Sequence, residues 1–181
     1  MKSYMTSLFT LALLSSTSYA DLSQMEGNTY TTGEMQWDGI TLLQKAANEG
    51  NALAQFTYAW ALDEGKGIAE NETQAKQWFM KSIEGLKKLA SEGNTDAMTA
   101  LGEIYDEGNG IRKDKKIAAQ WYTQAVEKGH AYAMYALADL YKEGKGVVKS
   151  LDKAKELYSA AAKNGIKKAE RKLHELEQGD D

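Results

Sequence analysis

The sequence contains no cysteine and no proline. Without cysteine no disulfide can form and no cysteine can carry a lipid anchor, so the fold must be stabilised by burial alone. Without proline the turns must be made by glycine and by polar capping residues, and the chain has 16 glycines. These two absences favour a protein built from short, regular, glycine-terminated elements.

An excess of positive charge is also missing, because 22 Lys and Arg face 26 Asp and Glu for a net charge of −4. Binding to nucleic acid calls for a basic face, so this balance argues against nucleic acid as a partner and against anionic membranes. The two histidines lack a second metal-type ligand at helical spacing, and we expect His130 in a turn and His174 in solvent. We therefore expect neither a metal site nor a cofactor.

A hydrophobic run long enough to span a bilayer is absent as well. The first twenty residues instead have the pattern of an export signal: Lys2, a short apolar core from Leu8 to Leu14, and Ser18-Tyr19-Ala20 as a cleavage site. We expect cleavage after Ala20 and a soluble periplasmic or secreted protein without membrane insertion. A buried N-terminal helix is the alternative reading of this segment.

The rest of the chain repeats one plan three times. Each copy has an apolar helical segment, a Gly-x-Gly turn and a second helical segment. The turns begin at Gly65, Gly108 and Gly144, so the copies are offset by 43 and then by 36 residues. Six residues after the turn glycine, each copy has a residue that is favoured at helix N-caps. These residues are Asn71, Asp114 and Ser150. Glycine at the turn suits the left-handed conformation that ends a helix.

The second helix of each copy (helix B, following helix A) has one apolar face. Ala118, Trp121, Tyr122 and Ala125 show the spacing in the second copy. Small residues recur where helix axes must approach closely, and we expect the large aromatics beside them to lie in the core. Those small residues are Ala59, Gly102 and Ala138 in helix A, and the aromatics are Trp78, Trp121 and Tyr122. Seven extra residues in the first copy predict a helix B that is about two turns longer, with Gly85 as the point where it would bend.

These patterns predict an all-α protein, a short α-solenoid of antiparallel helix pairs. The expected segments are a signal peptide at 1–20, a flexible lead-in at 21–36, an N-terminal half repeat at 37–53, repeats at 54–96, 97–132 and 133–168, and a C-terminal capping helix and tail at 169–181. Terminal repeats need a polar outer face, which the charged C-terminal helix supplies.

The repeated residues resemble a known family. The pattern A-x-x-x-L-G-x-x-Y-x-x-G-x-G followed by K-x-A-x-x-W-Y-x-x-A-x-x-x-G is similar to the Sel-one-like repeat, a relative of the tetratricopeptide repeat, and it extends over residues 37–169. The resemblance implies a right-handed solenoid whose concave surface is lined by helix A and is used for protein–protein interaction. A cysteine-rich subgroup of this family is associated with β-lactam binding, and this chain lacks those cysteines.

Positions of helix A that point away from the core are expected to face the concave surface. They lie 12, 9, 5 and 2 residues before the turn glycine. The predicted partner-binding residues are Phe56, Trp60, Asp63, Thr99, Glu103, Asp106, Tyr132, Tyr135, Asp139 and Lys142, with Leu53 and Asp96 at the outermost register. Aromatic anchors with a charged surround are typical of binding hot spots, and the acids favour a partner with a basic segment. The alternative is a solvated acidic face with the aromatics packed between helices.

No catalytic pattern accompanies this surface. The Gly-x-Gly turns lack the full phosphate-loop pattern, and the acid pair Asp106-Glu107 is typical of a solvent-facing helix. The sequence therefore predicts a monomeric adaptor or regulator rather than an enzyme. Two alternatives stay open: an immunity protein that neutralises a cognate secreted toxin or lipase effector, and a hydrolase acting on cell-wall or β-lactam-type substrates.

Overall fold

A computed structural model describes residues 29–32 and 35–178, with side chains described from residue 39 onward. The predicted signal peptide lies outside the described residues, as do the start of the predicted lead-in and the last three residues. The elements are β1 (Thr29–Thr32), β2 (Met35–Asp38), α1 (Ile40–Asn48), α2 (Ala52–Glu64), α3 (Glu72–Ser91), α4 (Thr95–Glu107), α5 (Lys115–Glu127), α6 (Ala131–Glu143), α7 (Leu151–Lys163) and α8 (Lys167–Gln178). Within this part of the chain no helix is both long enough and apolar enough to span a bilayer.

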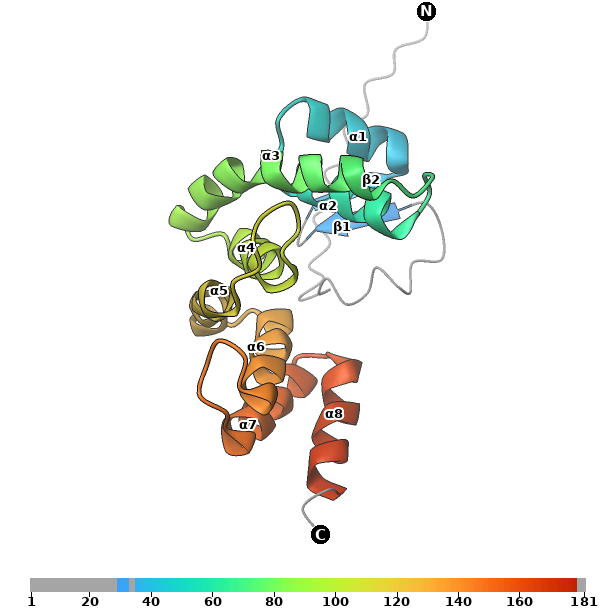
Figure 1. The fold of residues 1–181 in the computed structure, drawn as a ribbon. Coiled ribbons are helices and arrows are strands. Elements are labelled where there is room, and N and C mark those ends of the chain that lie inside the picture. Colours follow the sequence, from blue (N-terminus) through green and yellow to red (C-terminus); the bar gives the residue numbers. More distant parts are fainter. Residues whose placement is uncertain (1–28, 33–34, 179–181) are drawn as a thin grey trace, which may run out of the picture.

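The helices form successive pairs, α2 with α3, α4 with α5, and α6 with α7. Each pair packs on the next, so the chain advances from α1 at one end of the molecule to α8 at the other (Figure 1). The prediction of an all-helical repeat solenoid is therefore confirmed. Helix α1 packs on α2 as a lone half repeat, and α8 packs on α7.

The predicted capping chemistry is present at each turn. Asn71, Asp114 and Ser150 accept hydrogen bonds from main-chain N–H groups in the first turns of α3, α5 and α7. The turn glycines at the ends of α2, α4 and α6 have φ of 65°, 78° and 70°, the left-handed region. Local sequence thus sets both ends of the inter-helix turn.

The second glycine of the turn has a packing role that the sequence did not reveal. A Cβ on Gly110 would lie 2.5 Å from the carbonyl oxygen of Lys76 in α3, and one on Gly146 would lie even nearer that of Lys115 in α5. Each turn therefore rests directly on the main chain of the preceding helix B. The Gly-x-Gly pattern joins consecutive repeats as well as ending a helix.

Helix α3 has 20 residues where α5 and α7 have 13, as the 43-residue offset predicts. At Gly85, where the sequence suggested a bend, a Cβ would come within 2.6 Å of the Ala52 Cβ. The glycine therefore allows α3 to pack closely against the start of α2.

The hairpin of β1 and β2 was not anticipated, because its residues belong to the predicted lead-in and to the first positions of the half repeat. The strands are antiparallel, with Thr29 opposite Asp38 and Thr32 opposite Met35. Strand β1 contacts α2, and β2 contacts α1. Helix α2 is consequently enclosed by α1, α3, α4 and the hairpin, and every residue from Ala52 to Ala59 is buried.

The buried side chains fall into two clusters that meet at α6. The larger extends from α1 to α6 and includes Leu43, Phe56, Phe79, Leu101 and Tyr122. The smaller joins α6 to α7 and α8. Of the aromatics predicted to be core, Tyr122 is buried, while Trp78 and Trp121 are partly buried against the larger cluster.

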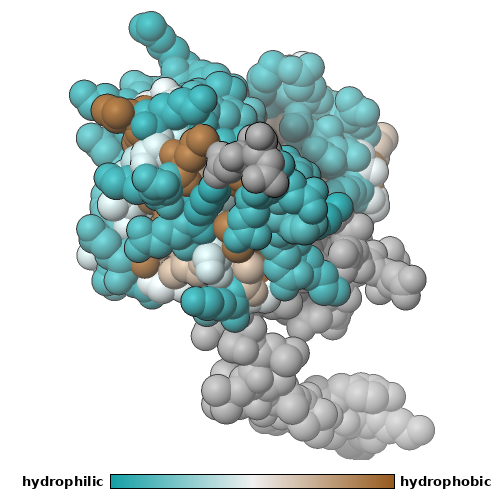
Figure 2. Space-filling model, turned by 90° about the horizontal axis from the view of Figure 1, so that it is seen from below, coloured by the Kyte–Doolittle hydropathy of each residue, from teal (hydrophilic) through white to brown (hydrophobic). Residues whose placement is uncertain are grey.

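The end formed by α8 is hydrophilic, with only scattered hydrophobic patches (Figure 2). In α8 only Ala169 is buried, while Leu173 and Leu176 pack on the smaller cluster. A polar outer surface over a small apolar inner face is what a terminal cap of a solenoid requires.

Candidate functional site

The ten residues predicted to bind a partner lie on α2, α4 and α6, and we call them the helix-A face. Two of them belong to the core. Phe56 and Thr99 have no exposed surface, and the Phe56 ring packs edge-on against Phe79 with 5.6 Å between ring centroids. The prediction that these two contact a partner is wrong for this conformation, because a single-helix periodicity cannot show that further elements cover the same face.

Around Thr99 lies a network that looks like a hydroxyl–imidazole–carboxylate relay. His130 Nδ1 is 3.1 Å from Thr99 Oγ1, and His130 Nε2 is 3.2 Å from Asp96 Oδ1. However, the Thr99 hydroxyl donates to the carbonyl of Thr95, and His130 Nδ1 accepts from the Ala133 N–H as the N-cap of α6. A buried hydroxyl whose proton is already donated is not a nucleophile. His130, predicted as a turn residue, instead links the start of α6 to α4.

Seven residues of the helix-A face are partly exposed: Trp60, Asp63, Asp106, Tyr132, Tyr135, Asp139 and Lys142. On α6 the Tyr132 and Tyr135 rings are 5.9 Å apart, and Tyr158 of α7 continues the row at the same spacing. The Tyr158 hydroxyl donates to Asp139. Burial and the Asp139 carboxylate raise the pKa of Tyr135 to about 12, so this hydroxyl remains a hydrogen-bond donor at neutral pH.

Glu103 is the unusual member of this face. Only 5% of it is exposed, and its Oε1 has no hydrogen-bond partner. Burial raises the pKa of Glu103 to about 8; the nearby Tyr132 hydroxyl and Trp60 N–H oppose the shift, and Asp106 and Glu107 add to it. The Trp60 Nε1 is likewise buried without a hydrogen bond of regular geometry. The face therefore contains a carboxyl group that is mostly neutral near pH 7, next to an unsatisfied donor.

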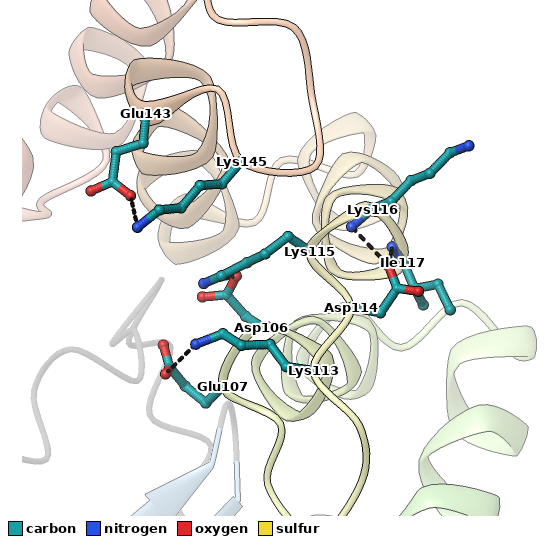
Figure 3. Close-up of polar contacts among 9 residues, drawn as sticks. All are labelled: Asp106, Glu107, Lys113, Asp114, Lys115, Lys116, Ile117, Glu143 and Lys145. Carbon is teal, nitrogen blue, oxygen red and sulfur yellow. Dashed lines mark hydrogen bonds and ion pairs between the residues drawn. The ribbon is translucent and has the colours of Figure 1, made fainter.

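The lysines beside Asp106 and Glu107, the two acids that act on Glu103, are paired (Figure 3). Lys115 Nζ lies 2.6 Å from Asp106 Oδ1, and Lys113 Nζ lies 3.5 Å from Glu107 Oε2. In the next repeat Lys145 Nζ lies 2.5 Å from Glu143 Oε2 (Figure 3). Glu103 takes part in none of these pairs.

A separate cavity of about 610 Å³ lies beside the turn of the second repeat. Its lining residues are Tyr105, Ile111, Arg112, Lys113, Asp114, Lys115 and Ile117. The sequence shows no sign of this cavity beyond the charged run 112–116. Its acids and lysines serve as caps or ion pairs, and among the described residues no His, Cys, Asp and Glu cluster could hold a metal ion.

A family model described as the Sel1 repeat matches residues 39–51, 52–85, 95–130 and 131–166. The chain belongs to the Sel1 repeat family. The stretch between the second and third matches, residues 86–94, falls where α3 is longer than the other B helices. Sel1 repeats generally mediate protein–protein interaction, which agrees with the resemblance noted from the sequence.

Solved Sel1 repeat proteins are similar to this chain. The crystal structure of a Sel1 repeat protein from Oxalobacter formigenes is 33% identical, with 74% of this chain and 95% of that one covered and a TM-score of 0.49. The protective antigen c5321 of uropathogenic Escherichia coli, described as having an SLR fold, is 30% identical, with 77% and 29% covered and a TM-score of 0.51. This chain thus corresponds to less than a third of c5321.

One further match is to an immunity protein. The immunity protein Pa5087 from Pseudomonas aeruginosa is 22% identical, with 72% of this chain and 59% of that one covered. Its TM-score of 0.40 is too low for its role to bear on this chain. No curated protein matches the sequence.

Proposed function

We propose that this Sel1 repeat protein binds another protein through the helix-A face and acts as an adaptor or regulator in the periplasm or outside the cell. The observation that carries the proposal is the continuous set of partly exposed aromatic and acidic side chains on α2, α4 and α6, grouped around a buried carboxyl and an indole N–H that lack hydrogen bonds.

The aromatics of this face are suited to being anchors. Tyr132 and Tyr135 are held by their mutual ring contact and by Tyr158, so they lose little side-chain freedom on binding. Trp60 is partly buried against the core and has an unsatisfied N–H. Trp and Tyr in partly enclosed positions are the residues that dominate binding energy at protein interfaces.

The exported location and the monomeric state belong to the same proposal. The N-terminal pattern of Lys2, apolar core and Ser18-Tyr19-Ala20 supports export. A partner would then be sought in the cell envelope or among secreted proteins.

Quantitative affinity capture with paired variants tests the proposal. Trp60→Ala and Tyr135→Ala remove anchors from the helix-A face, whereas Leu42→Ala and Val148→Ala remove apolar side chains that are 49% and 87% exposed elsewhere. Proteins captured from the organism's own envelope by wild type and both controls, but lost with both anchor variants, are then purified for calorimetry. We expect each anchor variant to weaken binding at least about tenfold, or roughly 1.4 kcal/mol. Equal affinity of the well-folded anchor variants and wild type would contradict the proposed face.

A further inference from the structure

We infer that the helix-A face contains a subsite for one arginine side chain of the protein partner, whose guanidinium group pairs with the carboxylate of Glu103 between Trp60 and Tyr132. The inference rests on the proposed function and adds the chemistry of the contact at its centre.

The first observation is that one oxygen of the buried Glu103 carboxyl accepts no hydrogen bond. The residue is 95% buried, its Oε1 accepts no hydrogen bond, and it takes part in no ion pair within the described chain. Leaving a buried polar group unpaired costs on the order of 1–3 kcal/mol, so such groups are normally bonded. A cationic guest would remove this cost.

The second observation is that the lysines beside the two neighbouring acids of α4 are already paired. Lys115 forms an ion pair with Asp106, and Lys113 forms one with Glu107 (Figure 3). Asp106 and Glu107 also add negative potential at Glu103. The two acids near the buried carboxyl are therefore already paired with lysines of their own repeat. A cation that pairs with Glu103 would have to come from a partner.

Donor and acceptor counts fit a guanidinium group. A carboxylate has about four lone-pair positions; the Trp60 N–H and Tyr132 O–H beside Glu103 are placed to occupy two once the group is ionised, and the fork of an arginine would occupy the others. Arginine keeps its charge when buried, whereas a buried lysine readily loses its proton. These properties favour arginine over lysine at a site this enclosed.

Pairing also releases a proton. Burial holds the pKa of Glu103 at about 8, so the free protein has mostly the neutral acid at pH 6, and binding of the guanidinium requires the carboxylate. The other charged or titratable groups facing it are Asp106 and Glu107 from α4, Tyr122 from α5 and Tyr132 from α6. Both acids are ion-paired, and burial raises the pKa of both tyrosines well above its ordinary value, so Glu103 is the group that titrates.

Nuclear magnetic resonance with a minimal probe tests the subsite directly. The side-chain carboxyl carbon of Glu103 is titrated with pH in the purified protein, alone and with N-acetyl-arginine amide or its neutral citrulline counterpart. We expect the arginine probe to lower the pKa of Glu103 below about 7 and citrulline to leave it unchanged. Affinity for the arginine probe should rise at least about fivefold from pH 6 to pH 8 and level off at higher pH.

Variants provide the controls. Glu103→Gln keeps the shape of the neutral acid, so it folds, and it should weaken arginine-probe binding at least tenfold and remove the pH dependence. Glu127→Gln makes the same charge change at an exposed position of α5 and should alter neither. Equal responses to arginine and citrulline, or unchanged binding by Glu103→Gln, would overturn the inference.

The captured partner separates this inference from the proposed function. If partner binding is lost in Trp60→Ala and Tyr135→Ala but is unaffected by Glu103→Gln and by pH, the arginine subsite is wrong and the binding face stands. If the arginine probe binds at Glu103 but Trp60→Ala and Tyr135→Ala leave the affinity for the partner unchanged, the subsite stands and the proposed face is wrong.

Discussion

Glu103→Gln should stabilise the protein increasingly as pH rises. In the unfolded chain this carboxyl ionises with a pKa near 4.5, whereas burial holds it at about 8 in the folded state. The folded protein therefore binds more protons than the unfolded chain between these values, and this contribution to stability is complete below pH 4.5 and is lost as pH rises through 8. Glutamine has the shape of the protonated acid but does not ionise. The stability of the variant therefore does not fall with pH through this group.

The size of the effect follows from the separation of the two pKa values. At pH 7 the wild type has lost about 3 kcal/mol relative to acidic pH, since each pKa unit corresponds to about 1.4 kcal/mol. Water reaching the carboxylate by local opening makes this an upper value. Between pH 5 and pH 7 the loss is about 2.5 kcal/mol, so for a chain of this size the variant should melt roughly 5–10 °C higher than wild type at pH 7, measured against their difference at pH 5.

Urea unfolding of wild type, Glu103→Gln and the exposed control Glu127→Gln at pH 5, 6, 7 and 8 measures this directly. Because other titrating groups are common to all three proteins, the difference between wild type and Glu103→Gln isolates this carboxyl. A difference that stays constant over the range would refute the burial of an unpaired acid. A matching trend in Glu127→Gln would show that the effect is one of net charge.

Three further substitutions test the packing of the repeats. Gly146→Ala should cost about 1–3 kcal/mol more in urea unfolding than Gly129→Ala, because both glycines have positive φ but only Gly146 meets backbone of the preceding repeat; equal losses would mean that the turn does not rest there. His130→Ala removes the α6 N-cap and its links to α4, so thermal unfolding should show a loss of about 1–2 kcal/mol, whereas no loss would count against the network. Tyr158→Phe removes the hydrogen bond to Asp139 and should cost about 1–2 kcal/mol in urea unfolding; a neutral result would contradict that bond.

The repeat architecture could be read from the sequence because it depends on local, repeated chemistry. Asn71, Asp114 and Ser150 differ in type but share capping ability at one register, and the turn glycines recur at fixed distances. These signals depend on the main chain of a few neighbouring residues, so they identify helix ends without tertiary information.

The candidate site was harder to predict because burial depends on neighbouring elements. Helical period assigned Phe56 to the partner-binding face, yet its ring packs on Phe79 of α3, and α2 is also enclosed by α1, α4 and the hairpin. Glu103 belongs to a residue type that is seldom buried, so it was predicted on the accessible partner-binding face and not as a buried group. His130 is outside the usual set of N-cap residues and was assigned only to a turn. The hairpin was missed although Tyr30, Met35 and Trp37 alternate with polar residues, because each run has only four residues and was assigned to a polar lead-in.

The division of the interior at α6 has a consequence for hydrogen exchange. Ala133 and Leu137 of α6 face the larger cluster, while Ala131 and Ala138 face the smaller one. Amides of α7 and α8 should therefore exchange through partial openings that leave α2 to α5 protected. A partner in contact with α2, α4 and α6 would span this boundary, so its binding should slow exchange in α7 and α8, which it does not touch.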